Sequence, residues 1–523
     1  MSVRSLSGAL RVLPALFALS APGTPAQVAP PPDLDRYVTQ VMERFQVPGL
    51  SLAIVKDGQI VAARGYGIRK LGAAPRVDAR TLFGIGSNTK VFTATALGIL
   101  VDEGKLAWDA PVVRYLPWFQ MYDAWVTREL TVRDLLVHRS GLGLGAGDLM
   151  FWPPTTFTRR ELSERLRFIA PATSFRSAYA YDNVLYAVAG EVVAAVSGVS
   201  WEEFVATRIL TPVGMTGSDI RLHHPDSVPN AAMTHALVEG TLAPVTPYLG
   251  DVVNPAGGIF SSAEDMARWM IVQLDSGRVA GGGRAFSAAT TRQLWAPVTP
   301  VPFGDPPQEL APLRRSFNFY ALGLGVQDYR GRRILTHTGG LPGYLSRVTM
   351  VPDLKLGVAV LTNMESGEAF NAVVQRILDH YMGFEPFDWL GAYTAVKARG
   401  DAQLAAFEAG QKAERNATSR PSLPLERYVG TYQDAWYGDV VLEREGDRLV
   451  VRFSRTPTLV GDLEHWQYDT FLVRWRLREL RADAFITFWL NPDGSIERVL
   501  MIPASPAVDF SYDFQDLRLR PVR

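Results

Sequence analysis

Hydrophobic and polar residues alternate in short runs near both ends of the larger, N-terminal part of the chain, and longer runs with helical spacing lie between them. Asp57-Gly58 separates two alternating runs and is a strong hairpin signal. A second pair of runs flanks Pro352-Asp353. Because consecutive strands that form hairpins pair antiparallel, we expect one antiparallel sheet covered by the intervening helices. The predicted pairs are residues 50–56 with 59–66, and 346–351 with 355–362.

The pattern changes from residue 428 onward, where short alternating runs flank turn residues. Closely spaced short strands of this kind are typical of a small barrel. The expected strands include residues 439–444, 448–453, 485–490 and 496–502, with 509–514 and 517–519 as the last strands. We therefore expect a first domain over residues 34–383, a helical linker over 384–423 and an all-β module over 424–523.

The N-terminus is typical of an export signal. Arg4 and Arg11 precede an apolar run over residues 12–19, and Thr24-Pro25-Ala26 offers a cleavage site. The alternative, a short membrane anchor, is disfavoured because the run is too short to span a bilayer. We expect a signal peptide over residues 1–26, a proline-rich linker over 27–33, and a periplasmic or secreted mature protein without a membrane span.

Composition narrows the possible functions. Of 523 residues, 47% are hydrophobic and 20% are charged, so the chain can bury a large core. The formal net charge is zero, which gives no electrostatic footprint for nucleic acid. The chain has no cysteine, so disulfides, thiolate catalysis and cysteine-ligated metals are excluded.

The stretch from Gly84 to Lys90, followed by the apolar residues 91–101, predicts a turn that opens a helix. Ser87 and Lys90 then lie one helical turn apart on the same face. A serine hydroxyl needs a base to become nucleophilic, and a desolvated lysine can be that base. Taken alone, the same residues are equally typical of an N-cap serine followed by a solvated lysine.

A second motif, Tyr181-x-Asn183, precedes another apolar helix. Tyr181 could relay a proton to the leaving group if Lys90 depresses the pKa of its phenol. Asn183 could donate to the neighbours of Lys90 or hold a substrate carbonyl. The alternative for Tyr181 is ordinary core packing.

A third motif, His337-Thr338-Gly339, ends a predicted strand and is a candidate substrate-binding edge. The backbone N–H of Gly340 could pair with the N–H of Ser87 as an oxyanion hole. The alternative for His337 is a hydrogen-bonded polar residue at a strand end.

Other clusters are weaker. Four residues could approach a metal, but no third ligand is fixed by helical spacing, so we expect no metal and no cofactor. These residues are His223, His224, Asp226 and His235.

Three further residues have alternatives that the sequence leaves open. Asp182 either tunes Tyr181 or faces solvent. Trp436 and Tyr437 either contact a ligand of the β module or pack in its core.

Together, these motifs and three others resemble the serine β-lactamase-like superfamily of penicillin-recognising hydrolases. That group includes class C β-lactamases, D,D-carboxypeptidases of the penicillin-binding-protein type, D-aminopeptidases and esterases. The resemblance implies an α+β hydrolase domain, with an antiparallel sheet flanked by helices and a helical subdomain, followed by a lipocalin-like barrel. It also implies acylation of Ser87, with Lys90 and Tyr181 as proton carriers. The supporting stretches are residues 86–90, 135–142, 181–183, 212–215, 255–258 and 337–340.

One position departs from the pattern of the penicillin-hydrolysing members, which usually carry lysine where this chain has His337. Histidine is mostly neutral near pH 7, so a fixed cation for a substrate carboxylate is missing there. The His-x-Gly form is similar to that of D-aminopeptidases and related peptidases or esterases. Several such relatives carry appended barrels, so we expect the β module to shape or cover the cleft.

The sequence therefore predicts a secreted serine hydrolase that cleaves a small ester or a D-amino-acid-type peptide through an acyl-enzyme on Ser87. A β-lactamase or D,D-carboxypeptidase acting on β-lactams or peptidoglycan is one alternative. A non-catalytic sensor that keeps the fold is another. The expected partner is a small-molecule ester, peptide or β-lactam.

Overall fold

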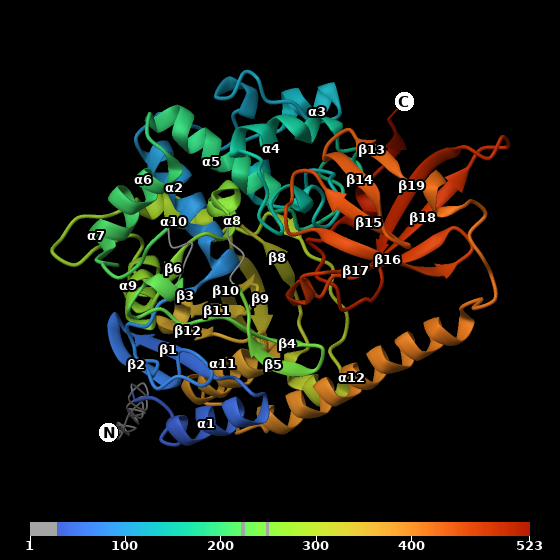
Figure 1. Ribbon diagram of the computed structural model, residues 1–523. Coiled ribbons are helices and arrows are strands. Elements are labelled where there is room, and N and C mark those ends of the chain that lie inside the picture. Colours follow the sequence, from blue (N-terminus) through green and yellow to red (C-terminus); the bar gives the residue numbers. More distant parts are fainter. Residues whose placement is uncertain (1–28, 221–224, 247–249, 523) are drawn as a thin grey trace, which may run out of the picture.

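The computed structural model describes residues 29–220, 225–246 and 250–522. The predicted signal peptide, residues 1–26, lies outside the described residues. The central element of the N-terminal part is an antiparallel sheet in the order β2-β1-β12-β11-β10-β9-β8-β7 (Figure 1). Its strands are β1 Gly49–Lys56, β2 Gln59–Gly67, β7 Thr299–Pro300, β8 Asn318–Tyr320, β9 Gly325–Tyr329, β10 Arg332–Leu341, β11 Tyr344–Val351 and β12 Leu356–Thr362.

Helices cover both faces of this sheet, which confirms the predicted α+β architecture. On one face, α1 and α11 bury a core against β1, β11 and β12. On the other face, α9 packs on β1 and β12, and the helical subdomain built around α2 and α5 lies beyond it. The longer helices are α1 Leu34–Arg44, α2 Lys90–Asp102, α5 Val184–Ser197, α9 Ala263–Leu274 and α11 Gly367–Met382; shorter ones are α3 Ala124–Glu129, α4 Arg159–Arg165, α6 Trp201–Val205, α7 Thr211–Val213, α8 Asn254–Gly257 and α10 Ala288–Leu294.

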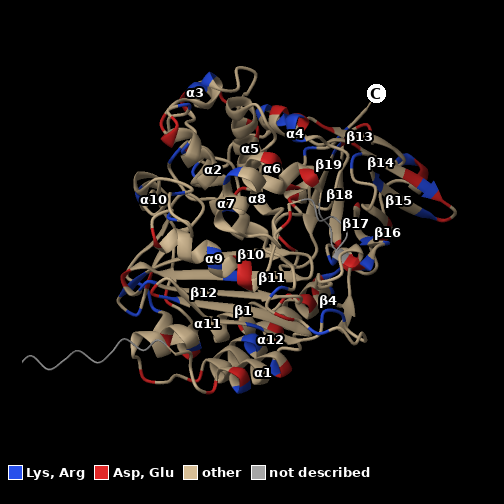
Figure 2. Cartoon of the chain, turned by 90° about the vertical axis from the view of Figure 1, so that its left-hand side faces the viewer, with Lys and Arg blue, Asp and Glu red and all other residues tan. Residues whose placement is uncertain are grey.

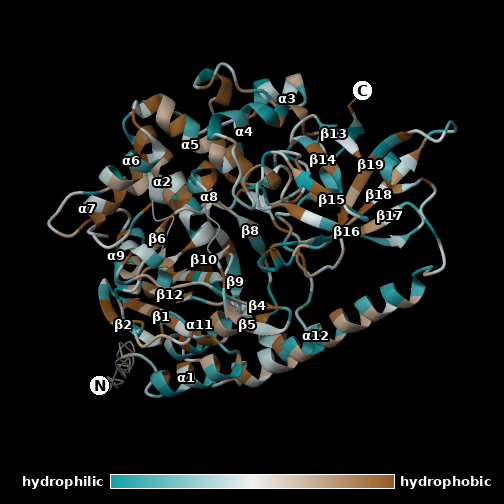
Figure 3. Cartoon of the chain, in the orientation of Figure 1, coloured by the Kyte–Doolittle hydropathy of each residue, from teal (hydrophilic) through white to brown (hydrophobic). Residues whose placement is uncertain are grey.

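The two helices at the centre of the subdomain, α2 and α5, are hydrophobic on most of their surface (Figure 3). A helix that is apolar all round is stable only when it is buried, and both lie within the core. In the described part of the chain no single helix is long and apolar enough to cross a membrane; α5 and the following helical segment Trp201–Val213 pass that test only as a pair bent by 76°. Basic and acidic residues are interspersed along the chain rather than gathered in one region (Figure 2).

The C-terminal module is an eight-stranded, near-closed antiparallel barrel, as the sequence predicted. Its first and last strands in the sheet order, β19 and β20, approach each other, and the Val499 N–H donates to the Leu519 carbonyl. The helix α12, Trp389–Glu414, runs along the bottom of Figure 1 and carries the chain to the barrel. The strands are β13 Gly430–Asp434, β14 Gly438–Glu445, β15 Arg448–Phe453, β16 Val460–Gln467, β17 Thr470–Trp475, β18 Ala484–Leu490, β19 Ile496–Pro503 and β20 Arg520–Pro521.

The prediction of a strand over residues 509–514 is wrong, and the last strand, predicted over 517–519, lies at Arg520–Pro521 after a single bridge between Leu519 and Val499. Between β19 and β20 the chain forms a loop with one 3₁₀ turn, Phe514–Asp516. The apolar residues that suggested strands are buried instead as loop anchors, among them Phe514 and Leu517. Part of this loop contacts the neighbouring domain through Ser511 and Asp513. Phe514 instead packs on Phe453 and Trp475 in the barrel.

Candidate active site

Ser87 lies in a 3₁₀ turn, Gly86–Thr89, which continues directly into α2. Side chains from a neighbouring strand hold this turn in place. The Ser346 hydroxyl on β11 donates to the Ile85 carbonyl at 2.7 Å and accepts from the Asn88 amide at 2.8 Å. Because these contacts are buried, the backbone that carries Ser87 is fixed before any substrate binds.

Lys90 is fully buried, and its ammonium nitrogen contacts three neutral acceptors. It lies 3.0 Å from the Ser87 hydroxyl oxygen, 2.7 Å from the Asn183 side-chain oxygen and 3.0 Å from the Ala256 carbonyl. Asn183 stands at the N-cap position of α5, but its side chain makes no cap hydrogen bond. A good capping residue is thus used to hold the lysine instead of the helix end.

The environment of Lys90 makes it a base near neutral pH. Burial lowers its pKa from 10.5 to about 7, because the interior disfavours the charged ammonium. The carboxylates of Asp148 and Asp182 oppose part of this shift. Near pH 7 a large fraction of Lys90 is therefore neutral and able to accept a proton from Ser87.

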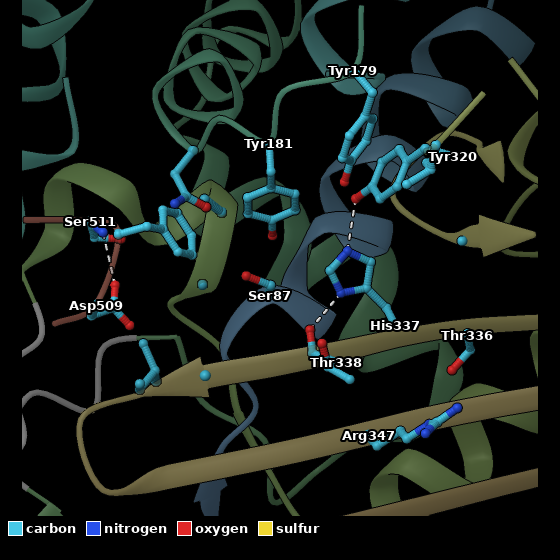
Figure 4. Close-up of a pocket in the computed structure, with 18 of the residues that line it drawn as sticks. Ser87, Tyr179, Tyr181, Tyr320, Thr336, His337, Thr338, Arg347, Asp509 and Ser511 are labelled. Carbon is cyan, nitrogen blue, oxygen red and sulfur yellow. Dashed lines mark hydrogen bonds between the residues drawn. The ribbon is translucent and has the colours of Figure 1, made fainter. Parts of the chain in front are cut away.

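The Tyr181 hydroxyl points toward Ser87 (Figure 4). Its ring centroid is 4.8 Å from the Lys90 nitrogen and 4.2 Å from the ring centroid of His138. Burial raises the pKa of Tyr181 well above its usual value of 10, and a hydrogen bond with Ser87 only partly opposes this. Lys90 does not depress this pKa, since loss of solvation of the phenolate dominates. Tyr181 is a protonated donor here, and Lys90 is the stronger candidate for the base.

Strand β10 passes close to the turn that carries Ser87. A Cβ atom on Gly339 would lie 1.8 Å from the Ile85 carbonyl oxygen. A Cβ atom on Gly86, where φ is +51°, would lie 2.8 Å from the Gly340 nitrogen. Only glycine permits both approaches. They bring the Gly340 nitrogen beside the turn of Ser87, where the predicted oxyanion hole requires it.

His337 and Thr338 also line the cavity at this strand. The His337 ring donates from Nδ1 to the Thr338 carbonyl at 2.5 Å and accepts at Nε2 from the Tyr320 hydroxyl at 2.8 Å, a tautomer assigned from these partners (Figure 4). Burial, with the nearby charge of Lys90, lowers the pKa of His337 from 6.5 to about 3. His337 is therefore neutral at physiological pH and supplies no cation.

These residues surround a cavity of about 540 Å³. Figure 4 shows Ser87 and Tyr181 at its centre, between His337 on one side and the barrel residues Asp509 and Ser511 on the other. The β module is expected to shape or cover the cleft, and the residues of this module that line the cavity lie in the loop between β19 and β20. No sequence pattern marked this loop as part of the site, because its residues approach Ser87 only in the fold.

Two further residues that the sequence did not single out are connected to Lys90. The Asp148 carboxylate accepts from the Asn183 side-chain nitrogen at 2.8 Å and from the Ser511 hydroxyl at 2.9 Å. Asp148 is fully buried, and burial raises its pKa well above 3.8. Asp148 directly follows Gly147, and no motif in the sequence points to it.

The residues considered for a metal site differ in their surroundings. Both ring nitrogens of His235 are occupied, by the Leu71 N–H and the Asn363 carbonyl, each at 2.9 Å. His223 and His224 lie outside the described residues. In the described part of the chain no group of three metal-ligating side chains is found.

Burial decides between the alternatives for Asp182, Trp436 and Tyr437. Asp182 is fully buried beside His138, which excludes the alternative that it faces solvent. Trp436 and Tyr437 are buried in the barrel core, which favours packing over ligand contact.

Comparison with protein families gives two matches. The model described as Beta-lactamase matches residues 34–381. The model described as a domain of unknown function, DUF3471, matches residues 414–521. The first match covers more than half of the chain and contains Ser87, Lys90, Tyr181 and His337.

Curated relatives include hydrolases. The chain is 28% identical over 510 residues to the Unguisins hydrolase ungD of Aspergillus violaceofuscus. The alignment covers 88% of this chain and 86% of that protein. It is 31% identical over 337 residues to Penicillin-binding protein 4 of Amycolatopsis lactamdurans, spanning 61% of this chain and 81% of that protein.

Solved structures share the fold. The octameric penicillin-binding protein homologue from Pyrococcus abyssi aligns with a TM-score of 0.58 at 22% identity, over 93% of this chain and 99% of that one. The crystal structure of SurE aligns with a TM-score of 0.53 at 19% identity, over 94% and 98% of the two chains. At these identities the likeness supports the architecture of domain and barrel together.

Proposed function

We propose that this chain, which belongs to the beta-lactamase family of serine hydrolases, cleaves an ester or amide bond of a small molecule or peptide through an acyl-enzyme on Ser87. The observation that carries the proposal is the contact between Ser87 and Lys90. A buried lysine whose pKa is about 7 lies 3.0 Å from the serine hydroxyl, which is the arrangement that a serine nucleophile requires of its base.

In acylation, the Ser87 oxygen attacks the substrate carbonyl while its proton passes to the neutral Lys90 nitrogen. The N–H groups of Ser87 and Gly340 stabilise the oxyanion. The tetrahedral intermediate then collapses, breaking the bond to the leaving group. Tyr181 donates a proton to the leaving oxygen or nitrogen and regains one from the Lys90 ammonium. In deacylation, a water molecule attacks the carbonyl of the Ser87 ester. The bond to the Ser87 oxygen breaks, Ser87 regains its proton, and the carboxylic acid of the acyl group is released.

The substrate class that we favour is a neutral ester or a D-amino-acid-type peptide. His337 is neutral and held by Tyr320 and the Thr338 carbonyl, so the His337 side chain itself supplies no positive charge to the cavity. An uncharged acyl group is therefore not penalised at this position.

A second candidate, hydrolysis of β-lactams or peptidoglycan peptides, is supported by a different observation. Arg315 and Arg347 line the same cavity, and a guanidinium suits the carboxylate that such substrates carry. The Arg347 guanidinium donates to the neutral side chains of Asn371 and Thr349. The relative named Penicillin-binding protein 4 supports the same candidate.

Intact mass after treatment with a fluorophosphonate, and separately with benzylpenicillin, tests both candidates. A phosphonate adduct on the wild type that is absent from Ser87→Ala supports the acyl-enzyme proposal. A lasting benzylpenicillin adduct favours the second candidate over the first. Failure of both reagents to label the wild type would contradict the proposal and favour a non-catalytic sensor.

We also propose export to the periplasm or the medium. Arg4 and Arg11 before a short apolar run, with small residues after it, support this location. N-terminal sequencing of protein recovered from the periplasm of a producing cell tests it. A mature chain that begins near residue 27 is expected, and an uncleaved cytoplasmic chain would contradict export.

A further inference from the structure

The loop between β19 and β20 is fixed against the catalytic domain by buried contacts. The Asp513 carboxylate accepts from the N–H groups of Gly147 and Leu149 at 2.6 and 2.9 Å. The Phe510 ring stands edge-on to the Tyr181 ring, with 6.1 Å between the centroids. A loop held at both of these places has one orientation relative to the active site.

From this loop a continuous chain of hydrogen bonds leads to the nucleophile. The Ser511 hydroxyl donates to Asp148 at 2.9 Å, and Asn183 donates to the same carboxylate oxygen at 2.8 Å. The Asn183 carbonyl oxygen then accepts from Lys90 at 2.7 Å, and Lys90 contacts Ser87 at 3.0 Å. Ser511, Asp148, Asn183 and Lys90 are each at most 9% exposed, so water does not replace these contacts.

We propose that the barrel module supplies a positioning residue, Ser511, which holds the carboxylate of Asp148 and thereby sets how readily Lys90 accepts a proton. This inference rests on the proposed role of Lys90 as the base of Ser87. It makes the barrel a part of the active site, whereas a lid or an anchor would leave Lys90 unaffected.

The direction of the effect follows from charge. Hydrogen bonds from Asn183 and Ser511 favour the ionised form of Asp148 and oppose the rise in its pKa that burial causes. An ionised Asp148 favours the ammonium form of Lys90 and raises the pKa of that lysine. Loss of the Ser511 hydroxyl therefore favours neutral Asp148, and the pKa of Lys90 falls.

Other titratable groups also act on these two residues. Asp509, in the loop between β19 and β20, also raises the pKa of Asp148. Asp148 in turn raises the pKa of the buried Asp513. Lys90 faces groups from the segment before α5, from α5 itself, from β10 and from the segment after the 3₁₀ turn 134–136. They are Asp182, Tyr181, Tyr186, His337 and His138. Because all of these stay in place in a Ser511 variant, a changed profile reports the Ser511 contact.

The experiment measures the rate at which a fluorophosphonate labels Ser87 between pH 5 and pH 9 in the full-length mature protein. The wild-type rate should rise with pH around pH 7. In Ser511→Ala the midpoint should move to lower pH by at least about 0.3 unit, and in Asp148→Asn by about one unit. Ser505→Ala is the matched control, since the Ser505 hydroxyl donates to the Glu408 carboxylate on the outer surface at 3.4 Å. Its profile should coincide with that of the wild type.

A Ser511→Ala profile that coincides with the wild type, or moves to higher pH, overturns the inference and leaves the acyl-enzyme proposal standing. Absence of labelling in the wild type overturns the acyl-enzyme proposal first. If Ser511→Ala is recovered only unfolded, Ser511→Thr and Asp148→Asn decide. The hydroxyl of threonine should preserve the wild-type profile, and Asp148→Asn should lower its midpoint; any other pair of results overturns the inference.

Discussion

The Ser87 hydroxyl and the Lys90 ammonium nitrogen are 3.0 Å apart, and Lys90 has no exposed surface. The contact joins a nucleophile in the 3₁₀ turn before α2 to a base at the first residue of that helix. Its consequence for function lies in the burial of the lysine, because an exposed lysine would stay protonated and could not accept the serine proton.

We expect hydrolysis of an activated ester to increase with pH through a midpoint near 7, since the neutral form of Lys90 is the active one and its pKa is about 7. Lys90→Arg should lower kcat by at least about 10³-fold at every pH between 5 and 9, because a guanidinium is not deprotonated in this range. The control is Lys105→Arg at a lysine that pairs with Glu103 on the surface. A Lys90→Arg enzyme with a normal pH profile would exclude Lys90 as the base.

Tyr181→Phe should separate catalysis from packing. The phenylalanine ring keeps the contacts with Lys90 and His138, whereas the hydroxyl that points toward Ser87 is lost. We expect kcat to fall by about 10²-fold, with the free energy of unfolding changed by about 1 kcal/mol or less. Tyr432→Phe is a matched control, because the buried Tyr432 hydroxyl donates only to the Tyr428 carbonyl in the barrel. Equal activities of the two variants would remove Tyr181 from the mechanism.

The sequence motifs and the fold account for different parts of the site. The spacing of Ser87 and Lys90 within one helical turn can be predicted because it depends only on local geometry. The structure also brings Tyr181 and His337 to the same cavity, although their roles stay predictions. The pKa of Tyr181 could not be predicted, because it depends on burial by residues distant in sequence.

The conformation of the loop between β19 and β20 also depends on contacts that the sequence alone does not predict. Tyr512 and Phe514 gave the alternating pattern of a strand, but Phe514 begins a 3₁₀ turn and packs on Phe453 and Trp475 of the barrel. Ser511 and Asp148 are 363 positions apart and carry no motif. Residues of this kind are identified only when the fold places them side by side.

His337 should make the folded state sensitive to acid. Its pKa is lowered from 6.5 to about 3 by burial, so between these pH values the unfolded chain binds more protons and folding stability falls as the pH decreases. Between pH 7 and pH 5 this contribution should amount to about 2 kcal/mol. Urea denaturation of the wild type and of His337→Gln at pH 7 and pH 5 measures this contribution. The difference in free energy of unfolding between the two proteins should change by that amount between the two pH values. A constant difference would contradict a buried neutral histidine.

Asp513 should stabilise the junction between the two modules. Asp513→Ala leaves the buried N–H groups of Gly147 and Leu149 without their acceptor, which should cost about 2 kcal/mol of unfolding free energy. Asp513→Asn keeps one acceptor oxygen and should cost less. Asp493→Ala, at an exposed turn where the carboxylate accepts from the Ser495 N–H, is the control and should change stability by less than about 0.5 kcal/mol. Similar losses in both alanine variants would argue against a special role for the junction.

Gly339→Ala tests the approach of β10 to the Ser87 turn. The added Cβ would lie 1.8 Å from the Ile85 carbonyl oxygen and 2.5 Å from the Ser346 hydroxyl, so the strand or the turn must move. A shift of about 1 Å displaces the Gly340 N–H from the oxyanion, and we expect kcat to fall by about 10²-fold or more. Gly304→Ala is the matched control, because nothing lies within 4 Å of the position of its Cβ. Steady-state hydrolysis of an activated ester measures both variants, and thermal unfolding shows whether Gly339→Ala remains folded. A folded Gly339→Ala enzyme with unchanged kcat would show that the Gly340 N–H does not stabilise the oxyanion.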